Sequence, residues 1–86
     1  MSDVALDVAA ERARQVQKHG GLLSDLENSV NDWVALCTRC LGDAATSTHK
    51  HNLEASYHAF IEVAATAIAA AEALDYVLIS QQTPPF

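Results

Sequence analysis

The feature that most constrains this chain is the segment over residues 52–80, which predicts one long helix. Apolar residues recur along it with the period of an α-helix. A helix of this length spans about 40 Å at 1.5 Å per residue. That is long for a monomer of three helices, so we expect its far end to pack on another subunit. The predicted apolar stripe consists of Leu53, Tyr57, Phe60, Ala64, Ile68, Ala71 and Leu78.

Two shorter helices are predicted before this segment. The first covers residues 3–18 and ends at Gly20, because glycine is favoured just past a helix C-terminus. The second covers residues 24–45, where Ser24 and Glu27 have the spacing of a capping box. The predicted apolar stripes are Ala5, Ala9, Ala13 and Val16 in the first helix, and Leu26, Val30, Trp33, Cys37, Leu41 and Ala44 in the second.

The remaining residues predict one loop and a tail. Residues 46–50 are polar and are expected to form the loop before the long helix. Residues 81–86 contain two prolines and are expected to be irregular. No strand is predicted. The expected fold class is therefore all-α: a single all-helical domain over residues 1–86, with three helices that form a helical bundle by oligomerisation.

The size and charge of the chain indicate which partners to expect. Half of its 86 residues are apolar, yet a chain this short buries only about 60–65% of its unfolded surface, so its core is marginal alone. Association with itself, as a dimer or tetramer, would add the missing contacts. The net charge of −6 argues against a nucleic-acid partner. Arg12, Arg14 and Lys18 are interpreted as one solvated helix face.

The apolar stretches, the first residues and the cysteines favour a cytoplasmic protein. The longest apolar-rich stretch, residues 63–71, is shorter than the roughly 20 residues that a membrane span needs. No signal peptide is expected, since the first residues are acidic rather than basic. The 2 cysteines give no disulfide framework. We therefore expect no membrane partner.

The acidic pair Glu72 and Asp75 is the most informative candidate site. The two acids are three residues apart and share a helix face, with Asp75 inside the predicted apolar stripe. Glu62 is expected to point to the opposite, solvated side. A carboxylate on a core-facing stripe is costly unless it is paired or bound to a metal. The partner is either an arginine of another helix (Arg12, Arg14 or Arg39) or a metal ion.

A second acidic cluster lies near the start of the second predicted helix and comprises Asp25, Glu27, Asn28 and Asp32. Acids at this end of a helix are favoured by its macrodipole, so the cluster has a purely structural interpretation. If it faced Glu72 and Asp75, the two clusters together would supply the oxygen ligands that Mg²⁺ prefers.

Three segments, residues 11–15, 28–35 and 63–75, occur in an order that resembles small phage and mobile-element relatives of the MazG-like all-α nucleotide pyrophosphohydrolases. The resemblance implies an active-site bundle of four helices built by oligomerisation. It also implies Mg²⁺, bound by a Glu-Glu-x-x-Glu motif and a later Glu-x-x-Asp motif. Glu72 and Asp75 match the second motif. Glu27, Asn28 and Asp32 occupy the place of the first without its spacing.

The resemblance implies a role for each candidate residue. The reaction would split a nucleoside triphosphate into a monophosphate and pyrophosphate. The expected catalytic residues are Glu72 and Asp75, and the expected metal ligands are Glu27, Asp32, Glu72 and Asp75. The expected substrate-binding residues are Asn28, Arg12, Arg14, Lys50 and Trp33, and Lys18 is a further candidate for holding the triphosphate. For Trp33 the simpler interpretation is that of a core residue.

Two other functions remain open at this point. The first is a non-catalytic helical assembly or protein-binding module on the same scaffold, encoded by a mobile element. The second is a zinc-binding adaptor that uses Cys37 and Cys40 with His49, His51 or His58. Four carboxylates around one cleft would favour the enzyme, whereas acids paired with arginine would favour the binding module.

Overall fold

The computed structural model describes residues 3–49 and 52–82 and confirms the all-α prediction. The described residues form α1 (Val4–His19), α2 (Leu22–Asp25), α3 (Val30–His49) and α4 (Leu53–Gln82), with no strand among them. The fold is that of one copy, so the bundle of several copies stays a prediction.

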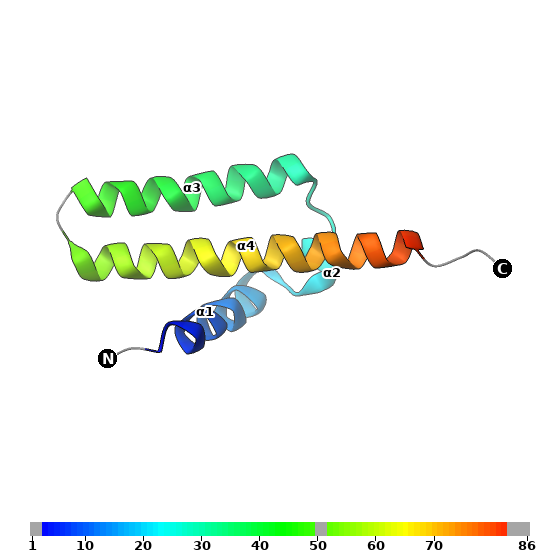
Figure 1. The fold of residues 1–86 in the computed structure, drawn as a ribbon, viewed down its shortest axis with the longest axis horizontal. Helices are drawn as coiled ribbons and strands as arrows, with labels where there is room; N and C mark the ends of the chain where they lie inside the picture. The colour runs from blue at the N-terminus through cyan, green and yellow to red at the C-terminus, as the bar shows by residue number, and fades with distance from the viewer. Residues whose placement is uncertain (1–2, 50–51, 83–86) are drawn as a thin grey trace.

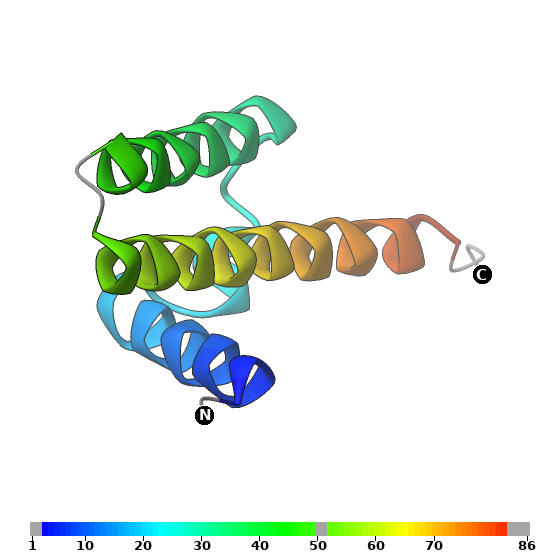
Figure 2. The same cartoon turned by 60° about the vertical axis from the view of Figure 1, so that its left-hand side comes forward.

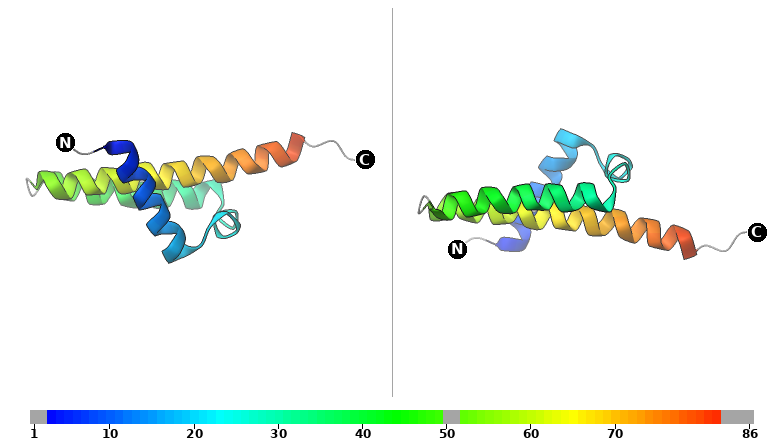
Figure 3. Two further views of the ribbon diagram at one scale, coloured as in Figure 1. Left: turned by 90° about the horizontal axis from the view of Figure 1, so that it is seen from below. Right: turned by 90° about the horizontal axis from the view of Figure 1, so that it is seen from above.

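Helix α4 is the centre of the structure, and every other helix packs against it. Figure 1 shows α3 running antiparallel to α4 along one side, with α1 on the opposite side. The turned view of Figure 2 shows α4 lying between these two helices. In Figure 3, α1 crosses α4 obliquely, whereas α3 follows it closely. The last turns of α4 extend beyond the start of α3 (Figure 1), which contributes to the longest dimension of 57 Å.

The first predicted helix is confirmed, with both of its ends explained locally. The Asp3 carboxylate accepts a hydrogen bond of 3.2 Å from the Leu6 amide, so Asp3 caps α1. The helix ends at Gly20, whose φ of +96° is a conformation that other residues rarely adopt. A Cβ at this position would also lie 2.9 Å from the Ser24 Cβ, so the turn into α2 needs glycine.

The prediction of one helix over residues 24–45 was wrong at both ends. The chain forms the single turn α2 and then restarts at Val30. The capping box lies at Ser29 and Asp32, which exchange hydrogen bonds of 2.8 and 3.1 Å, and not at Ser24 and Glu27. The Ser24 hydroxyl instead donates to the His19 carbonyl, so it stabilises the preceding turn.

At its other end α3 continues through residues 46–49, where a loop was predicted. The Thr46 hydroxyl donates to the Gly42 carbonyl at 3.1 Å, which satisfies this polar side chain within the helix. Lys50 and His51 lie outside the described residues.

The predicted stripe of α4 was also wrong for one copy of the chain. Its large members Leu53, Phe60, Ile68 and Leu78 are exposed. The buried side chains of α4 are mostly small: Ser56, Ala59, Ile61, Ala65, Thr66, Ala69 and Ala73. The reason is that α1 and α3 cover α4 from two sides, and small side chains let both helices approach closely.

The stripes predicted for the shorter helices met different outcomes. In α1 the predicted stripe of alanines is exposed, so that prediction was wrong for one copy. In α3 the prediction was partly correct. Trp33 and Ala44 are buried, but Val30 and Leu41 are exposed. Trp33 packs against Ala69 and Ala73 of α4, which fixes the start of α3 on the middle of α4.

Helix α4 is long and apolar enough to cross a membrane by length and composition. The sequence prediction underestimated this property because it considered only residues 63–71. The core helix of a soluble protein meets the same criterion, so this property of α4 does not decide between the two environments. The absence of a membrane partner and the cytoplasmic location stay predictions.

Candidate functional site

The candidate site is a cleft of about 420 Å³ between α1, α3 and α4, closed at one end by the turn into α2. Four of the chain's five lysine and arginine residues line it: Arg12, Arg14, Lys18 and Arg39. In a chain with a net charge of −6, this concentration of cations gives one location a charge opposite to that of the whole protein.

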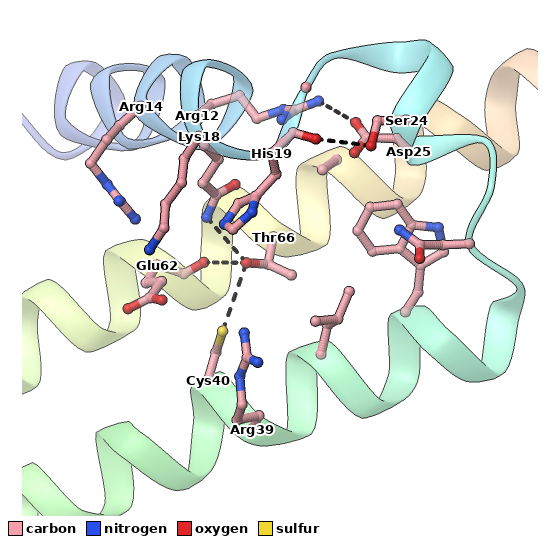
Figure 4. A pocket seen from close by; sticks show the side chains of 16 residues that line it. Arg12, Arg14, Lys18, His19, Ser24, Asp25, Arg39, Cys40, Glu62 and Thr66 are labelled. Carbon is pink, nitrogen blue, oxygen red and sulfur yellow. Dashed lines mark hydrogen bonds and ion pairs between the residues drawn. The ribbon is translucent and has the colours of Figure 1, made fainter.

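The floor of the cleft is held together by Thr66 of α4. Its hydroxyl donates to the Glu62 carbonyl at 2.8 Å and accepts from the Gln15 amide at 3.3 Å. The Cys40 sulfur lies 3.8 Å from the same oxygen. Figure 4 shows these interactions meeting at Thr66, between Lys18 of α1 and Arg39 of α3. One hydroxyl therefore links α1, α3 and α4 and fixes the walls of the cleft relative to one another.

Arg12 is committed to a structural ion pair. Its Nη2 lies 2.7 Å from a carboxylate oxygen of Asp25 and 3.9 Å from one of Glu72. Asp25 is 8% exposed, and such a carboxylate is stable only with a partner of opposite charge. The pair ties α1 to α2, and Figure 4 shows it at the rim of the cleft.

Arg14 is paired within its own helix. It donates to both carboxylate oxygens of Glu11, with an Nη2–Oε2 distance of 2.8 Å. These hydrogen bonds lower the pKa of Glu11 and raise the pKa of Arg14. Arg14 reaches the cleft, but its guanidinium already has an anionic partner.

Lys18 and Arg39 have no ion pair within residues 3–49 and 52–82. Figure 4 shows Lys18 reaching into the cleft from α1 and Arg39 reaching into it from α3. Glu62 of α4 lines the same cleft and is half-buried. The prediction that Glu62 is solvated on the opposite side was therefore wrong. Its position is explained by α1, which covers the side of α4 that the sequence pattern assigned to water.

Asn28 and Trp33 also line the cleft. Trp33 is only 6% exposed and belongs to the core with Ala69 and Ala73. Of its two interpretations, the core role is therefore the observed one. Its indole N–H donates to no acceptor in the described part of the chain, and every fully buried side-chain nitrogen there has a partner. The N–H is therefore not fully buried.

The four acids expected to bind a metal do not line this cleft. Asp32 caps α3, and Glu72 lies beside Arg12. Glu27 and Asp75 are exposed, so the prediction that Asp75 lies inside a buried stripe was wrong. Within the described ranges no three histidine, cysteine or acidic residues are placed to hold a metal ion. The residues of one copy therefore do not fit the Mg²⁺ site that the resemblance implies.

The zinc alternative gains no support from the described residues. Cys40 is buried and Cys37 is half-buried, and both are free thiols. Cys40 contacts Thr66 rather than a histidine. His58 lies on α4 with its side chain exposed, and His51 is outside the described residues.

Comparison of the chain with protein-family models, curated proteins and solved structures finds no match. Arg12, Arg14, Asn28 and Trp33, expected to bind substrate, do line one cleft. Sequence reasoning missed Gln15, Arg39 and Thr66 as cleft residues, because no spacing within one helix brings them together.

Proposed function

We propose that the cleft binds a phosphate-bearing small molecule, and that the ligand class is a nucleotide. The observation that carries this proposal is the convergence of Arg12, Arg14, Lys18 and Arg39 on one cleft in an acidic chain. Arginine and lysine form strong charge-assisted hydrogen bonds with phosphate oxygens. The volume of about 420 Å³ is within the usual range for small-molecule sites.

Two further lining residues, Asn28 and Trp33, support a ligand with a polar ring. The Trp33 indole N–H is a donor, and the Asn28 side chain provides both donors and an acceptor. Both residues line the cleft, and no described residue bonds to the Asn28 side-chain amide. A nucleotide combines a phosphate group and a base with hydrogen-bonding edges, so its two parts match the cations and these polar groups of the cleft.

Hydrolysis is a separate part of the proposal and rests on the resemblance. Nucleotide pyrophosphohydrolysis would release pyrophosphate from a nucleoside triphosphate in the presence of Mg²⁺. Glu72 and Asp75 are the residues of this chain that match the implied motif, and both are accessible to solvent. Since the acids of one copy do not gather, activity would depend on an assembly of several copies.

Calorimetric titration with a panel of ribo- and deoxyribonucleoside triphosphates tests the binding proposal. We expect saturable binding by the parent chain and weaker binding by Asn28→Leu. Asn31→Leu is the matched control, because Asn31 is exposed and outside the cleft. Parent protein that binds no nucleotide, or equal losses in the two variants, would contradict the proposal.

Pyrophosphate release tests the hydrolytic part with the same panel. We expect release that requires Mg²⁺, stops with a chelator and is abolished by Asp75→Asn. Binding without release would leave nucleotide binding in place and reject the hydrolase.

A specific observation favours a second function, that of a non-catalytic helical assembly module. Arg12 and Arg14 are both paired with acids, and the end of α4 exposes several large apolar side chains. A folded oligomer that binds no nucleotide would establish this alternative.

A further inference from the structure

We infer that Lys18 and Arg39 are the residues that bind the phosphate group, and that it lies between α1 and α3 above Thr66. This inference rests on the proposed function and deepens it, because it assigns the recognition of the anion to two of the four cations. Arg39 was not among the residues that the sequence suggested for substrate binding.

Two of the four cations, Arg12 and Arg14, already have an acidic partner. Arg12 holds Asp25 at 2.7 Å, and moving it to a ligand would leave a largely buried carboxylate without a partner. Arg14 donates twice to Glu11 and would have to break both hydrogen bonds. Lys18 and Arg39 form no direct ion pair in the part of the chain that the structure describes, although the charge of Lys18 also acts on Glu11. They can therefore bind an anion without breaking an existing pair.

Lys18 and Arg39 each lie near a residue that contacts the Thr66 hydroxyl. Lys18 follows Gln15 by three residues on the same face of α1, and Gln15 donates to the Thr66 hydroxyl. Arg39 directly precedes Cys40 on α3, and Cys40 contacts the same hydroxyl. The two cations thus flank one fixed point from opposite walls, as Figure 4 shows. This arrangement fits a compact anion that accepts hydrogen bonds on two sides.

Glu62 and Asp25 are acids that line the same cleft, and Asp25 is already paired with Arg12. Glu62 has a different effect. The pKa of Arg14 is raised mainly by its hydrogen bonds with Glu11, and the charge of Glu62 adds to this effect. A bound phosphate would be repelled by this carboxylate, since like charges at close range oppose binding. Glu62 therefore weakens anion binding, and its neutralisation should strengthen it. If the cleft had only a structural role, neutralising Glu62 would not strengthen anion binding.

The test uses calorimetric titration at low ionic strength with two probes, inorganic tripolyphosphate and a nucleoside triphosphate. Lys18→Met and Arg39→Met should each weaken binding of both probes by about tenfold, the size of one lost charge-assisted hydrogen bond. Arg14→Gln should weaken it less than either. Because Lys18 and Arg39 are exposed, both variants should keep the helical circular dichroism of the parent.

Glu62→Gln should tighten the binding of both probes several-fold. Glu54→Gln is its matched control, because it removes the same charge from an exposed site on α4 outside the cleft. Equal tightening in the two variants would mean that net charge alone acts, and would overturn the role of Glu62.

The outcomes separate this inference from the proposed function. Nucleotide binding that survives both Lys18→Met and Arg39→Met would overturn the inference and leave the proposed function in place. Tripolyphosphate binding that both variants lose, with no preference for nucleotides over tripolyphosphate, would support the inference and reject the nucleotide. No binding of either probe by the parent would overturn both.

Discussion

The two parts of α4 differ sharply in what surrounds them. Over residues 53–73 the helix lies between α1 and α3, and its buried side chains are mainly alanine, serine and threonine. Over residues 74–82 it has no buried residue, although this part carries larger apolar side chains. The five large ones, Leu74, Tyr76, Val77, Leu78 and Ile79, are 40% to 58% exposed.

This difference shows that hydrophobicity alone does not decide which part of a helix is buried. The enclosed part is covered because small side chains let two helices approach it. The protruding part has a stronger apolar character but no neighbour in one copy. Since helices in proteins gain most of their stability from packing, we expect the protruding part to be covered in an assembly.

The strongest test of the enclosed part is the removal of its largest anchor. Trp33→Ala should lower the free energy of unfolding by about 3–5 kcal/mol, because it empties the contact with Ala69 and Ala73. Urea denaturation followed by circular dichroism measures the change. Val34→Ala, at an exposed site on the same helix, should have almost no effect. Similar losses in both variants would contradict the enclosed core.

A smaller loss of stability is expected when a larger side chain replaces one of the small buried residues of α4. Ala65 is 0% exposed, so Ala65→Leu should push α4 away from its neighbours and cost about 2–3 kcal/mol. Ala67→Leu adds the same atoms at an exposed site of α4 and should be tolerated. Thermal unfolding of the two variants measures the difference between their melting temperatures. An unchanged melting temperature for Ala65→Leu would show that the helices do not approach closely.

A still smaller loss of stability is expected when the ion pair between α1 and α2 is broken. Arg12→Met should destabilise the chain by about 1–2 kcal/mol, since it leaves the Asp25 carboxylate without its partner in a partly buried site. The double variant Arg12→Met with Asp25→Asn should recover part of the loss. If the double variant is less stable than Arg12→Met alone, Asp25 has another role. Chemical denaturation of the three chains tests this point.

The smallest effect on folding is expected in the protruding part of α4. Leu78→Glu should change the free energy of unfolding of the monomer by less than about 0.5 kcal/mol, because Leu78 contacts little in one copy. It should nevertheless weaken self-association, which sedimentation velocity measures. Ser80→Glu is the control for added charge on the same exposed segment. Equal self-association of parent, Leu78→Glu and Ser80→Glu chains would show that this end is not the contact between copies.

The candidate site was predictable in part, and particular residues show why. Arg14 and Lys18 are four residues apart in the sequence, so a helical pattern places them on a common face. Arg39 joins them only because α3 folds back along α4 and brings its middle opposite α1. The sequence also could not show that Glu62 faces the cleft. Two helices cover α4 from different sides, so α4 has no single solvated face. The expected metal ligands do not gather in one copy, since Asp32 belongs to the capping box of α3, Glu72 lies beside Arg12, and Glu27 and Asp75 are exposed.

The sequence by itself determined the helical content, the end of α1 at Gly20 and the length of α4. These features depend on backbone preferences and on residues a few positions apart. The tertiary structure decided which faces are buried, where α3 begins and which four cations share a cleft. Those outcomes depend on contacts such as Thr66 with Gln15 and Cys40, which connect helices that are distant in the chain. A periodic pattern states that a face is apolar, but only the neighbouring helix determines whether that face is covered.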